Sequence, residues 1–163
     1  MNFFENIKIQ ILRRENIFFL IFTILIFFLD RFSKNIILND YTENQVYINE
    51  YVNFNLIWNT GIGFGIFSTD SILVYNSITI IIGLVILYLF YIQLISDQID
   101  RIIFCMIIGG ALGNFYDRLV LQAVPDFIDL HYKEFHWFTF NVADIFISFG
   151  IIAFITRSFF VKN

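Results

Sequence analysis

The sequence predicts a membrane-embedded all-α bundle of four transmembrane helices with a small extracytoplasmic β-rich cradle. Hydrophobic residues make up 58% of the 163 residues, including 23 Phe, and charged residues only 15%. Such a composition is typical of an integral membrane protein. Apolar segments recur at lengths near the roughly 20 residues that cross a bilayer. The segments between them on one side of the membrane alternate apolar and polar residues, as strands do.

Four apolar segments are expected to span the membrane: 16–37, 72–95, 102–116 and 142–160. The third is short and needs its flanking residues to cross. The first has a basic start like a secretory signal peptide, but DRFSK follows where small residues would mark a cleavage site, so it is interpreted as a retained helix. No Pro/Gly/Ser-rich linker divides the sequence, which favours a single integral-membrane domain over 1–163.

Lys and Arg residues predict the orientation of the bundle. Four spans place both termini on one side of the membrane. That side carries six basic residues and the other side four: Lys8, Arg13, Arg14, Arg101, Arg157 and Lys162 against Arg31, Lys34, Arg118 and Lys133. Because positive charge is enriched on the cytoplasmic side, both termini are expected to be cytoplasmic and the segments 38–71 and 117–141 to lie outside.

The first outer segment predicts a strand. The apolar residues of this segment alternate with mostly polar ones, which gives a period of two: Val52, Phe54, Leu56 and Trp58 against Asn53, Asn55, Ile57 and Asn59. The strand runs into NTGIGFGIF, whose three glycines fit either an ordinary turn or a surface that contacts lipid or an extended ligand. HYKEFHWFTF, before the last span, is also expected to be extended and to add to a small outer sheet.

Polar residues of the spans gather at one level. The first span runs outward and ends with Asp30 and Lys34, the third ends with GNFYDRL, and the fourth begins with NVAD. An even number of spans brings these three places to the same side whichever way the bundle is oriented. Charged groups at a membrane boundary are costly and usually functional, so this end of the bundle is the expected site.

Within the cluster the spacing places residues on shared helix faces. Asn114 and Arg118 are four residues apart, and Asn141 and Asp144 three apart. Simpler structural roles stay open: Asp30 and Lys34 could form a helix-end ion pair, Asp117 could pair with Arg118 or Lys34, and Asn141 could cap the fourth helix together with Asp144.

Two carboxylates stand out as candidates for chemistry. Asp126, in the sequence AVPDFIDL, is expected in a loop that returns to the membrane beside Asp144. Two neighbouring carboxyl groups at a low-dielectric boundary do not both ionise cheaply and would share a proton. One is then an acid and the other a base, as an aspartic protease requires.

Other functions fit less well. His131 and His136 are five residues apart in an extended segment and no HExxH occurs, so neither a metal nor a cofactor is expected. Ser33 is adjacent to Lys34, too close for a dyad on one helix face. The net charge of −4 argues against nucleic acid. A small transporter would place its charge near the bilayer midplane, and a scaffold that binds a partner helix would not need both Asp126 and Asp144.

Five segments resemble, in order, the motifs of the lipoprotein signal peptidase (signal peptidase II) family of bacterial membrane aspartic proteases. They are FFLDRFSK, WNTGIGFGIF, GGALGNFYDRL, VPDFIDL and FNVADIFISFG, and they cover nearly the whole chain. Arg31 is a departure, since Gln is common at that place in the family.

The resemblance implies a catalytic pair, Asp126 and Asp144, with no metal or cofactor. It implies that eight residues bind substrate or support the pair: Asp30, Lys34, Asn59, Gly63, Asn114, Asp117, Arg118 and Asn141. The implied substrate is a prolipoprotein with diacylglycerol on its lipobox Cys, cut just before that Cys. Membrane lipids and globomycin-type inhibitors are the other implied partners, and the implied location is the bacterial inner membrane, with the site near the outer face.

Overall fold

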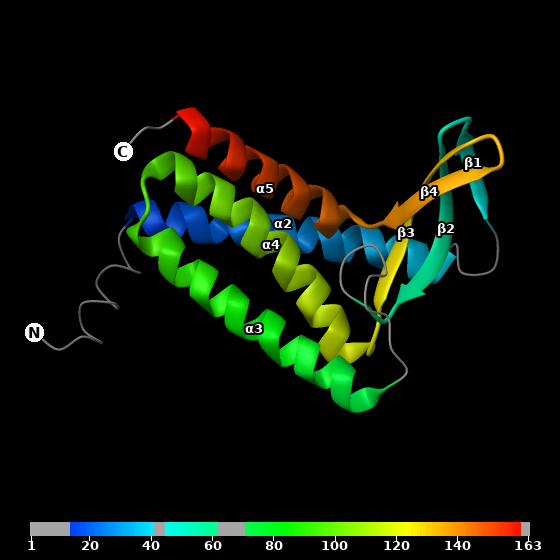
Figure 1. Cartoon of the computed structure of the whole chain (residues 1–163), viewed down its shortest axis with the longest axis horizontal. Helices are drawn as coiled ribbons and strands as arrows, with labels where there is room; N and C mark the ends of the chain where they lie inside the picture. The colour runs from blue at the N-terminus through cyan, green and yellow to red at the C-terminus, as the bar shows by residue number, and fades with distance from the viewer. Residues whose placement is uncertain (1–13, 41–44, 62–70, 161–163) are drawn as a thin grey trace, which may run out of the picture.

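The computed structural model describes residues 14–40, 45–61 and 71–160. In these residues four helices form an elongated bundle with a small sheet at one end (Figure 1). The helices are α2 (Arg14–Asp40), α3 (Ile72–Ile95), α4 (Gln98–Val120) and α5 (Val142–Phe160). All four are long and apolar enough to cross a membrane. The predicted four-span fold is confirmed.

The helix boundaries follow the prediction in α3 and α5 but not in α4. The predicted span 102–116 is too short at both ends, since α4 covers Gln98–Val120. At its start the side chain of Asp97 accepts hydrogen bonds from the backbone N–H groups of Ile99 (2.9 Å) and Asp100 (3.0 Å), which caps the helix. At its end the helix continues through polar residues because their side chains lie on its buried face. Similarly, α2 continues to Asp40, beyond the predicted 37.

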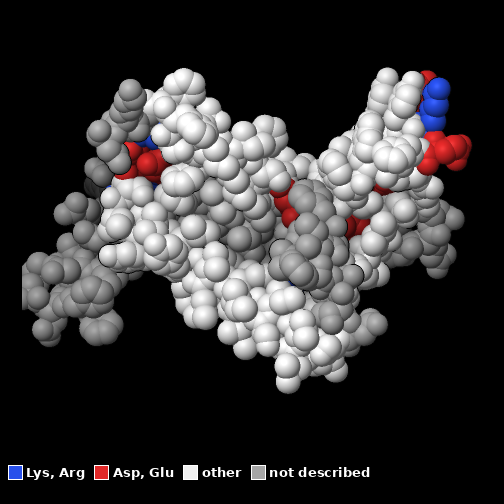
Figure 2. Space-filling view, in the orientation of Figure 1, with Lys and Arg blue, Asp and Glu red and all other residues white. Residues whose placement is uncertain are grey.

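Helix α4 is the centre of the bundle and packs against α2, α3 and α5. Two glycines permit the closest of these contacts. A Cβ on Gly110 would lie 2.5 Å from the carbonyl oxygen of Ala143, and a Cβ on Gly113 would overlap the carboxylate of Asp30. Glycine at these positions therefore lets α5 and Asp30 approach the α4 backbone. Over the helices the visible surface is almost free of charge (Figure 2), as expected for surfaces that face lipid.

The sheet is antiparallel with the order β1-β2-β3-β4. Its strands are β1 (Val46–Asn49), β2 (Val52–Asn59), β3 (Val124–Tyr132) and β4 (Phe135–Phe140). The predicted strand at 52–59 and the predicted extended segment before α5 are confirmed. The loop predicted around Asp126 is wrong, because this residue lies in β3. Gln122, with a left-handed φ of 57°, reverses the chain after α4 and leads it into β3.

A bulge in β2 determines which way its side chains point. Asn53 pairs with Asp129 and Asn59 with Val124, and the register shifts between Phe54 and Ile57. In a regular strand two residues six apart share a face. Because of the shift, Asn59 lies on the Asp126 face of the sheet and Asn53 on the Asp129 face. The strand therefore supplies one buried Asn to each face.

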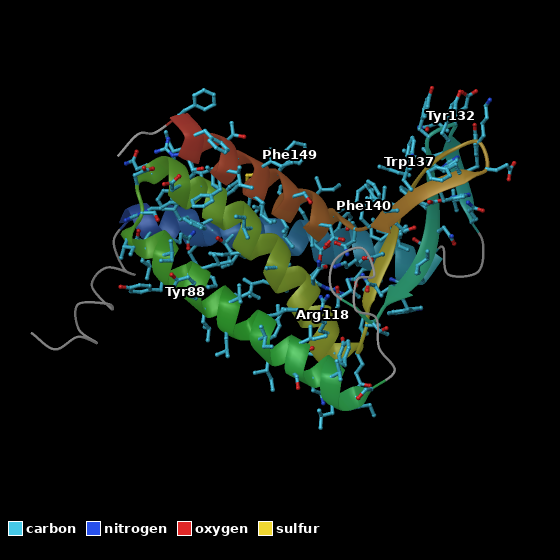
Figure 3. The ribbon with its side chains drawn as sticks, in the orientation of Figure 1. Tyr88, Arg118, Tyr132, Trp137, Phe140 and Phe149 are labelled. Atoms are coloured by element: carbon cyan, nitrogen blue, oxygen red, sulfur yellow. The ribbon has the colours of Figure 1, made fainter. Side chains whose placement is uncertain are left out.

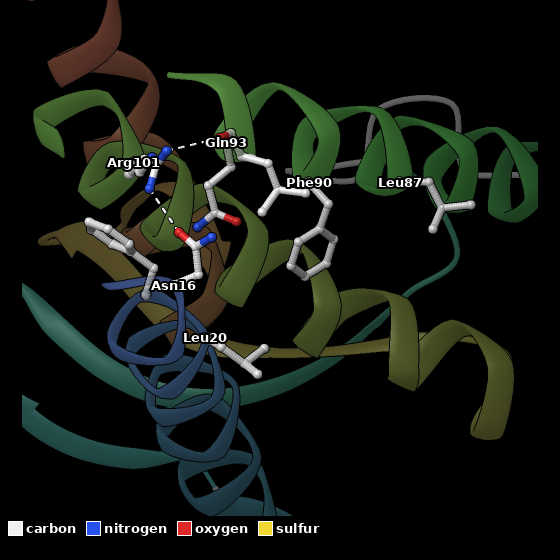
Figure 4. A pocket seen from close by; sticks show the side chains of 8 residues that line it. Asn16, Leu20, Leu87, Phe90, Gln93 and Arg101 are labelled. Carbon is white, nitrogen blue, oxygen red and sulfur yellow. Dashed lines mark hydrogen bonds between the residues drawn. The ribbon is translucent and has the colours of Figure 1, made fainter. Parts of the chain in front are cut away.

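The opposite end of the bundle has its own polar contacts. Arg157 pairs with Asp97 (2.6 Å) and Asp100 (2.8 Å). A cavity of about 260 Å³ opens nearby and is lined mainly by apolar residues of α2 and α3. Arg101 lies at this cavity and donates to the side-chain oxygen of Asn16 at 2.8 Å (Figure 4). The start of α2 and the end of α3, which supply most of its lining, lie at the end of the bundle away from the sheet (Figure 1).

Candidate active site

The predicted site residues meet where the sheet joins the bundle. They come from the C-terminal parts of α2 and α4, the start of α5, β2 and β3. Acidic residues are visible in this hollow between bundle and sheet (Figure 2), and Arg118 marks it in Figure 3. Nine of the ten are buried: Asp30, Lys34, Asn59, Asn114, Asp117, Arg118, Asp126, Asn141 and Asp144. The tenth, Gly63, lies outside the described residues.

Asn141 connects the two candidate catalytic carboxylates. Its side-chain amide donates to Asp126 Oδ1 at 2.6 Å, and its backbone N–H donates to Asp144 Oδ2 at 3.1 Å. Its side-chain oxygen accepts the Asp144 N–H at 3.1 Å, which completes a reciprocal cap at the start of α5. The capping role left open by the sequence is therefore real, and the same residue also holds Asp126.

Asp126 is 3% exposed and has an amide donor on each oxygen. Besides Asn141, the side chain of Asn59 donates to Asp126 Oδ2 at 2.8 Å, and Asn59 in turn accepts the N–H of Gly61 at 2.8 Å. Burial raises the pKa of Asp126 to about 6, and the neighbouring charge of Asp144 adds to the rise. Near neutral pH this carboxyl group therefore gains and loses a proton readily.

Asp144 is oriented through a relay that begins at Lys34. The Lys34 ammonium donates to Asn114 Oδ1 at 2.8 Å, and Asn114 Nδ2 donates to Asp144 Oδ1 at 2.8 Å. Because Lys34 can only donate, the oxygen of Asn114 must face it and the NH₂ group must face Asp144. The Lys34 ammonium therefore determines that Asn114 presents its NH₂ donor to Asp144.

Lys34 is fully buried and uses three donors. Besides Asn114 it donates to Asp30 Oδ2 at 2.8 Å and to Asp117 Oδ2 at 2.7 Å. Asp30 Oδ1 accepts the backbone N–H of Ala143 at 2.9 Å, which ties α2 to the first turn of α5. The predicted ion pair of Asp30 and Lys34 is present, and it belongs to a larger network that joins three helices.

Arg31 is a member of this network that sequence reasoning missed. Its guanidinium pairs with the second oxygen of Asp117 and stacks over the ring of Tyr116, 4.7 Å from its centroid. Two carboxylates, Asp30 and Asp117, therefore face two cations, and the formal charges balance. The sequence indicated this role of Arg31 only through its position next to Asp30, where Gln is common in the family motif.

Arg118 contacts backbone oxygens instead of Asp117. It donates to the carbonyl of Asn114 at 3.0 Å and to that of Gly61 at 2.8 Å. Its Nε has no hydrogen-bond partner in the part of the chain that the structure describes. The shared face of Asn114 and Arg118 is confirmed. The possible pair of Asp117 with Arg118 is not formed, because Asp117 binds Arg31 and Lys34.

A groove leads from the outside of the bundle to Asp144. It has a volume of about 420 Å³ and runs between β4 and α5, where Phe140 and Phe149 lie (Figure 3). Its lining is almost wholly apolar: Phe138, Phe140, Asp144, Ile145, Ser148, Phe149 and Ile152. Fold and site together define a multi-pass membrane protein in which a buried carboxylate lies at the end of an apolar groove.

Comparison with known proteins identifies the family. A family model described as signal peptidase (SPase) II matches residues 22–160. The lipoprotein signal peptidase of Pelagibacter ubique is 50% identical over 147 residues, with 88% of this chain and 89% of the relative covered. That of Aquifex aeolicus is 40% identical over 154 residues, with coverage of 93% and 91%. The chain belongs to the signal peptidase II family and is a membrane-spanning peptidase.

Solved structures agree with this assignment. Two structures described as a bacterial membrane enzyme solved by the in meso method are each 26% identical to this chain. Their TM-scores are 0.70 and 0.69; the first covers 86% of this chain and 87% of the solved one, the second 85% and 90%. The resemblance found in the sequence is confirmed at the level of family and fold.

Proposed function

We propose that the chain is an aspartic endopeptidase that removes the signal peptide from diacylglyceryl-modified prolipoproteins, cutting before the lipidated Cys. Asp126 and Asp144 form its catalytic pair. The observation that carries this proposal is Asn141, which donates to Asp126 from its side chain and to Asp144 from its backbone. One residue thereby holds two buried carboxylates from different elements in a fixed relation.

The chemistry follows from a pair that shares one proton. The ionised carboxylate takes a proton from a water molecule, and the water oxygen attacks the scissile carbonyl carbon. The protonated carboxyl group gives its proton to the carbonyl oxygen, so a neutral tetrahedral intermediate forms. A proton then passes to the amide nitrogen, the C–N bond breaks, and an acid and an amine leave.

The surrounding polar residues act as supports in this scheme. Asn59 and Asn141 hold Asp126, and Asn114 holds Asp144 with its own orientation set by Lys34. Amide donors keep each carboxylate in place without a cation on it, which leaves the shared proton available. Asp30 and Asp117 anchor Lys34. Arg118 holds Gly61, and Gly63, included from its motif, is proposed to approach the substrate.

The apolar groove beside Asp144 supports a lipid-bearing substrate. A diacylglyceryl group or the apolar part of a signal peptide would be stabilised by burying apolar surface against Phe140, Ile145 and Phe149. The scissile bond would then lie level with the outer ends of the helices. Membrane lipids and globomycin-type lipopeptides are proposed to occupy the same groove.

A cleavage assay tests the substrate. The purified protein is given a lipobox peptide with or without the diacylglyceryl group, and product is measured by mass spectrometry. We expect rapid cleavage of the lipidated peptide only, at the bond before the Cys, and inhibition by globomycin. Equal rates for both peptides, or cleavage that globomycin does not affect, would contradict the proposed specificity.

We also propose that the protein lies in the bacterial cytoplasmic membrane with both termini in the cytoplasm. The sheet and the carboxylate pair then face outward. Two variants test this orientation, Glu50→Cys in the β1–β2 turn and Gln98→Cys at the start of α4. Both positions are exposed. An impermeant thiol reagent added to intact cells should label the first position and not the second. Labelling of both, or only of the second, would overturn this orientation.

A further inference from the structure

A second polar cluster lies on the face of the sheet that points away from Asp126. Asp129 and His131 are on β3, three and five residues after Asp126, and alternation places them on the opposite face. His136 on β4 is the cross-strand partner of His131. The two imidazole rings are stacked, with their centroids 5.3 Å apart. Two histidines and an aspartate thus converge on one face of this hairpin, whose outer part Tyr132 and Trp137 mark in Figure 3.

The ligand-type atoms of this cluster are close together. One carboxylate oxygen of Asp129 and one ring nitrogen of each histidine all lie within 4.8 Å of one another. Asp129 Oδ2 is 2.7 Å from His136 Nδ1. Asp129 is 2% exposed and His131 6% exposed, whereas the side chain of His136 is 50% exposed. The cluster therefore has a buried floor and one ligand through which an ion can enter from solvent.

Two buried atoms beside the cluster lack a partner. His131 Nδ1 and Asn53 Oδ1 make no hydrogen bond within the described residues, although both side chains are more than nine-tenths buried. Asn53 lies next to His131, with Asn53 Nδ2 3.4 Å from His131 Nε2. Buried polar atoms in native proteins are almost always paired, and an exception commonly marks a water molecule or an ion.

We propose that Asp129, His131 and His136 bind a divalent transition metal ion, for which Zn²⁺ is the best match. Two imidazoles and one carboxylate are a common donor set for zinc, with water in the fourth position. At zinc–ligand distances of about 2.1 Å, tetrahedral ligands are about 3.4 Å apart. The widest separation therefore needs to close by about 1.4 Å at most, and the 2.7 Å pair of Asp129 Oδ2 and His136 Nδ1 needs to open by about 0.7 Å. Asn53 Oδ1 is available to accept a hydrogen bond from the metal-bound water.

The position of the ion gives it a structural role. It would join β3, which carries Asp126, to β4, which leads directly into Asn141. The bound ion would then hold these two strands together on the face away from the catalytic pair. Because its ligands lie on the opposite face of the sheet from Asp126, the ion would take no part in the peptide cleavage chemistry.

Metal binding to the full-length, tag-free protein in detergent tests the proposal. After treatment with a chelator, the protein is titrated with Zn²⁺ and metal content is measured by mass spectrometry. We expect one equivalent of zinc per chain and a higher unfolding temperature. Cobalt should bind at the same stoichiometry and give the visible absorption of a four-coordinate site. A wild-type protein that binds no equivalent of either metal would overturn the proposal.

Variants identify the ligands. His136→Gln changes a half-exposed side chain and should weaken zinc binding by more than about tenfold, since even the loss of an outer-shell group costs about 10–100-fold. Glu134→Gln, in the turn of the same hairpin, is the matched control and should bind as the wild type does. Asp126→Asn should also keep the metal. Binding that survives His136→Gln, or that is lost with Asp126→Asn, would place the ion elsewhere. These readouts do not depend on peptidase activity.

Discussion

Asp126→Asn and Asp144→Asn are each expected to abolish cleavage of a lipidated prolipoprotein while the protein stays folded. Each replacement is nearly isosteric, but an amide neither stores nor transfers the shared proton. Because each general acid or base step contributes about 10²–10⁴-fold, the loss of both roles of the pair should reduce kcat by about 10⁴-fold or more. The measurement is single-turnover cleavage by purified protein. Asp40→Asn, at the exposed end of α2, is the control and should cleave normally. Retained cleavage by either variant would rule out Asp126 and Asp144 as the catalytic pair.

The pH dependence of stability checks the same carboxyl group without an activity assay. The pKa of Asp126 is raised from 3.8 to about 6 in the folded protein, so the folded state binds this proton more tightly than the unfolded state. The stabilisation of the folded state by this proton is complete below about pH 4 and is lost as the pH rises through about 6. The free energy of unfolding falls by a total of ~3 kcal/mol over this range. Asp126→Asn should lack this part of the pH dependence. Identical profiles for the two proteins would show that Asp126 titrates normally.

Lys34→Met is expected to destabilise the fold more than any other single change of a charged residue discussed here. It removes the ammonium from between Asp30 and Asp117 and leaves the oxygen of Asn114 without its donor. Loss of one partner from a buried ion network costs about 3–5 kcal/mol, because the remaining charges stay buried and uncompensated. The measurement is the free energy of unfolding in detergent.

Lys133→Met provides the matched control for Lys34→Met. Lys133 is exposed in the β3–β4 turn, and its ammonium lies 5.4 Å from the centroid of the Tyr132 ring, a cation–π contact. An exposed charge contributes about 0–1 kcal/mol, so this variant should unfold almost as the wild type does. Equal stability of the two Lys→Met proteins would show that the buried network does not hold the helix ends together.

Much of the fold was predictable because the membrane imposes a simple pattern. Helices α3 and α5 are mostly apolar along their length, and their predicted bounds match the structure. The sequence also predicted that the polar helix ends meet at one level, since an even number of spans brings them to the same side of the membrane. Helix α4 was predicted too short because hydropathy cannot distinguish a polar residue that leaves the membrane from one on a buried helix face.

Long-range pairing accounts for what the sequence could not predict. Strand β3 contains Pro125 and two acids, a poor strand by propensity, and it forms because β2 and β4 pair with it on either side. The meeting of His131 with His136 depends on the tight turn between them, so a spacing of five residues gave no sign of it. Arg31 and Asp117 lie 86 residues apart, and nothing local indicates that pair.

The bulge in β2 makes the backbone path of that strand as important as its composition. If β2 kept every residue but ran as a regular strand, Asn59 would share a face with Asn53 and turn to the far side of the sheet, away from Asp126. Every side chain of the strand could be kept, yet the support of one carboxylate would be lost. In a strand of this length, the irregular pairing between Phe54 and Ile57 is therefore as necessary for the site as Asn59 itself.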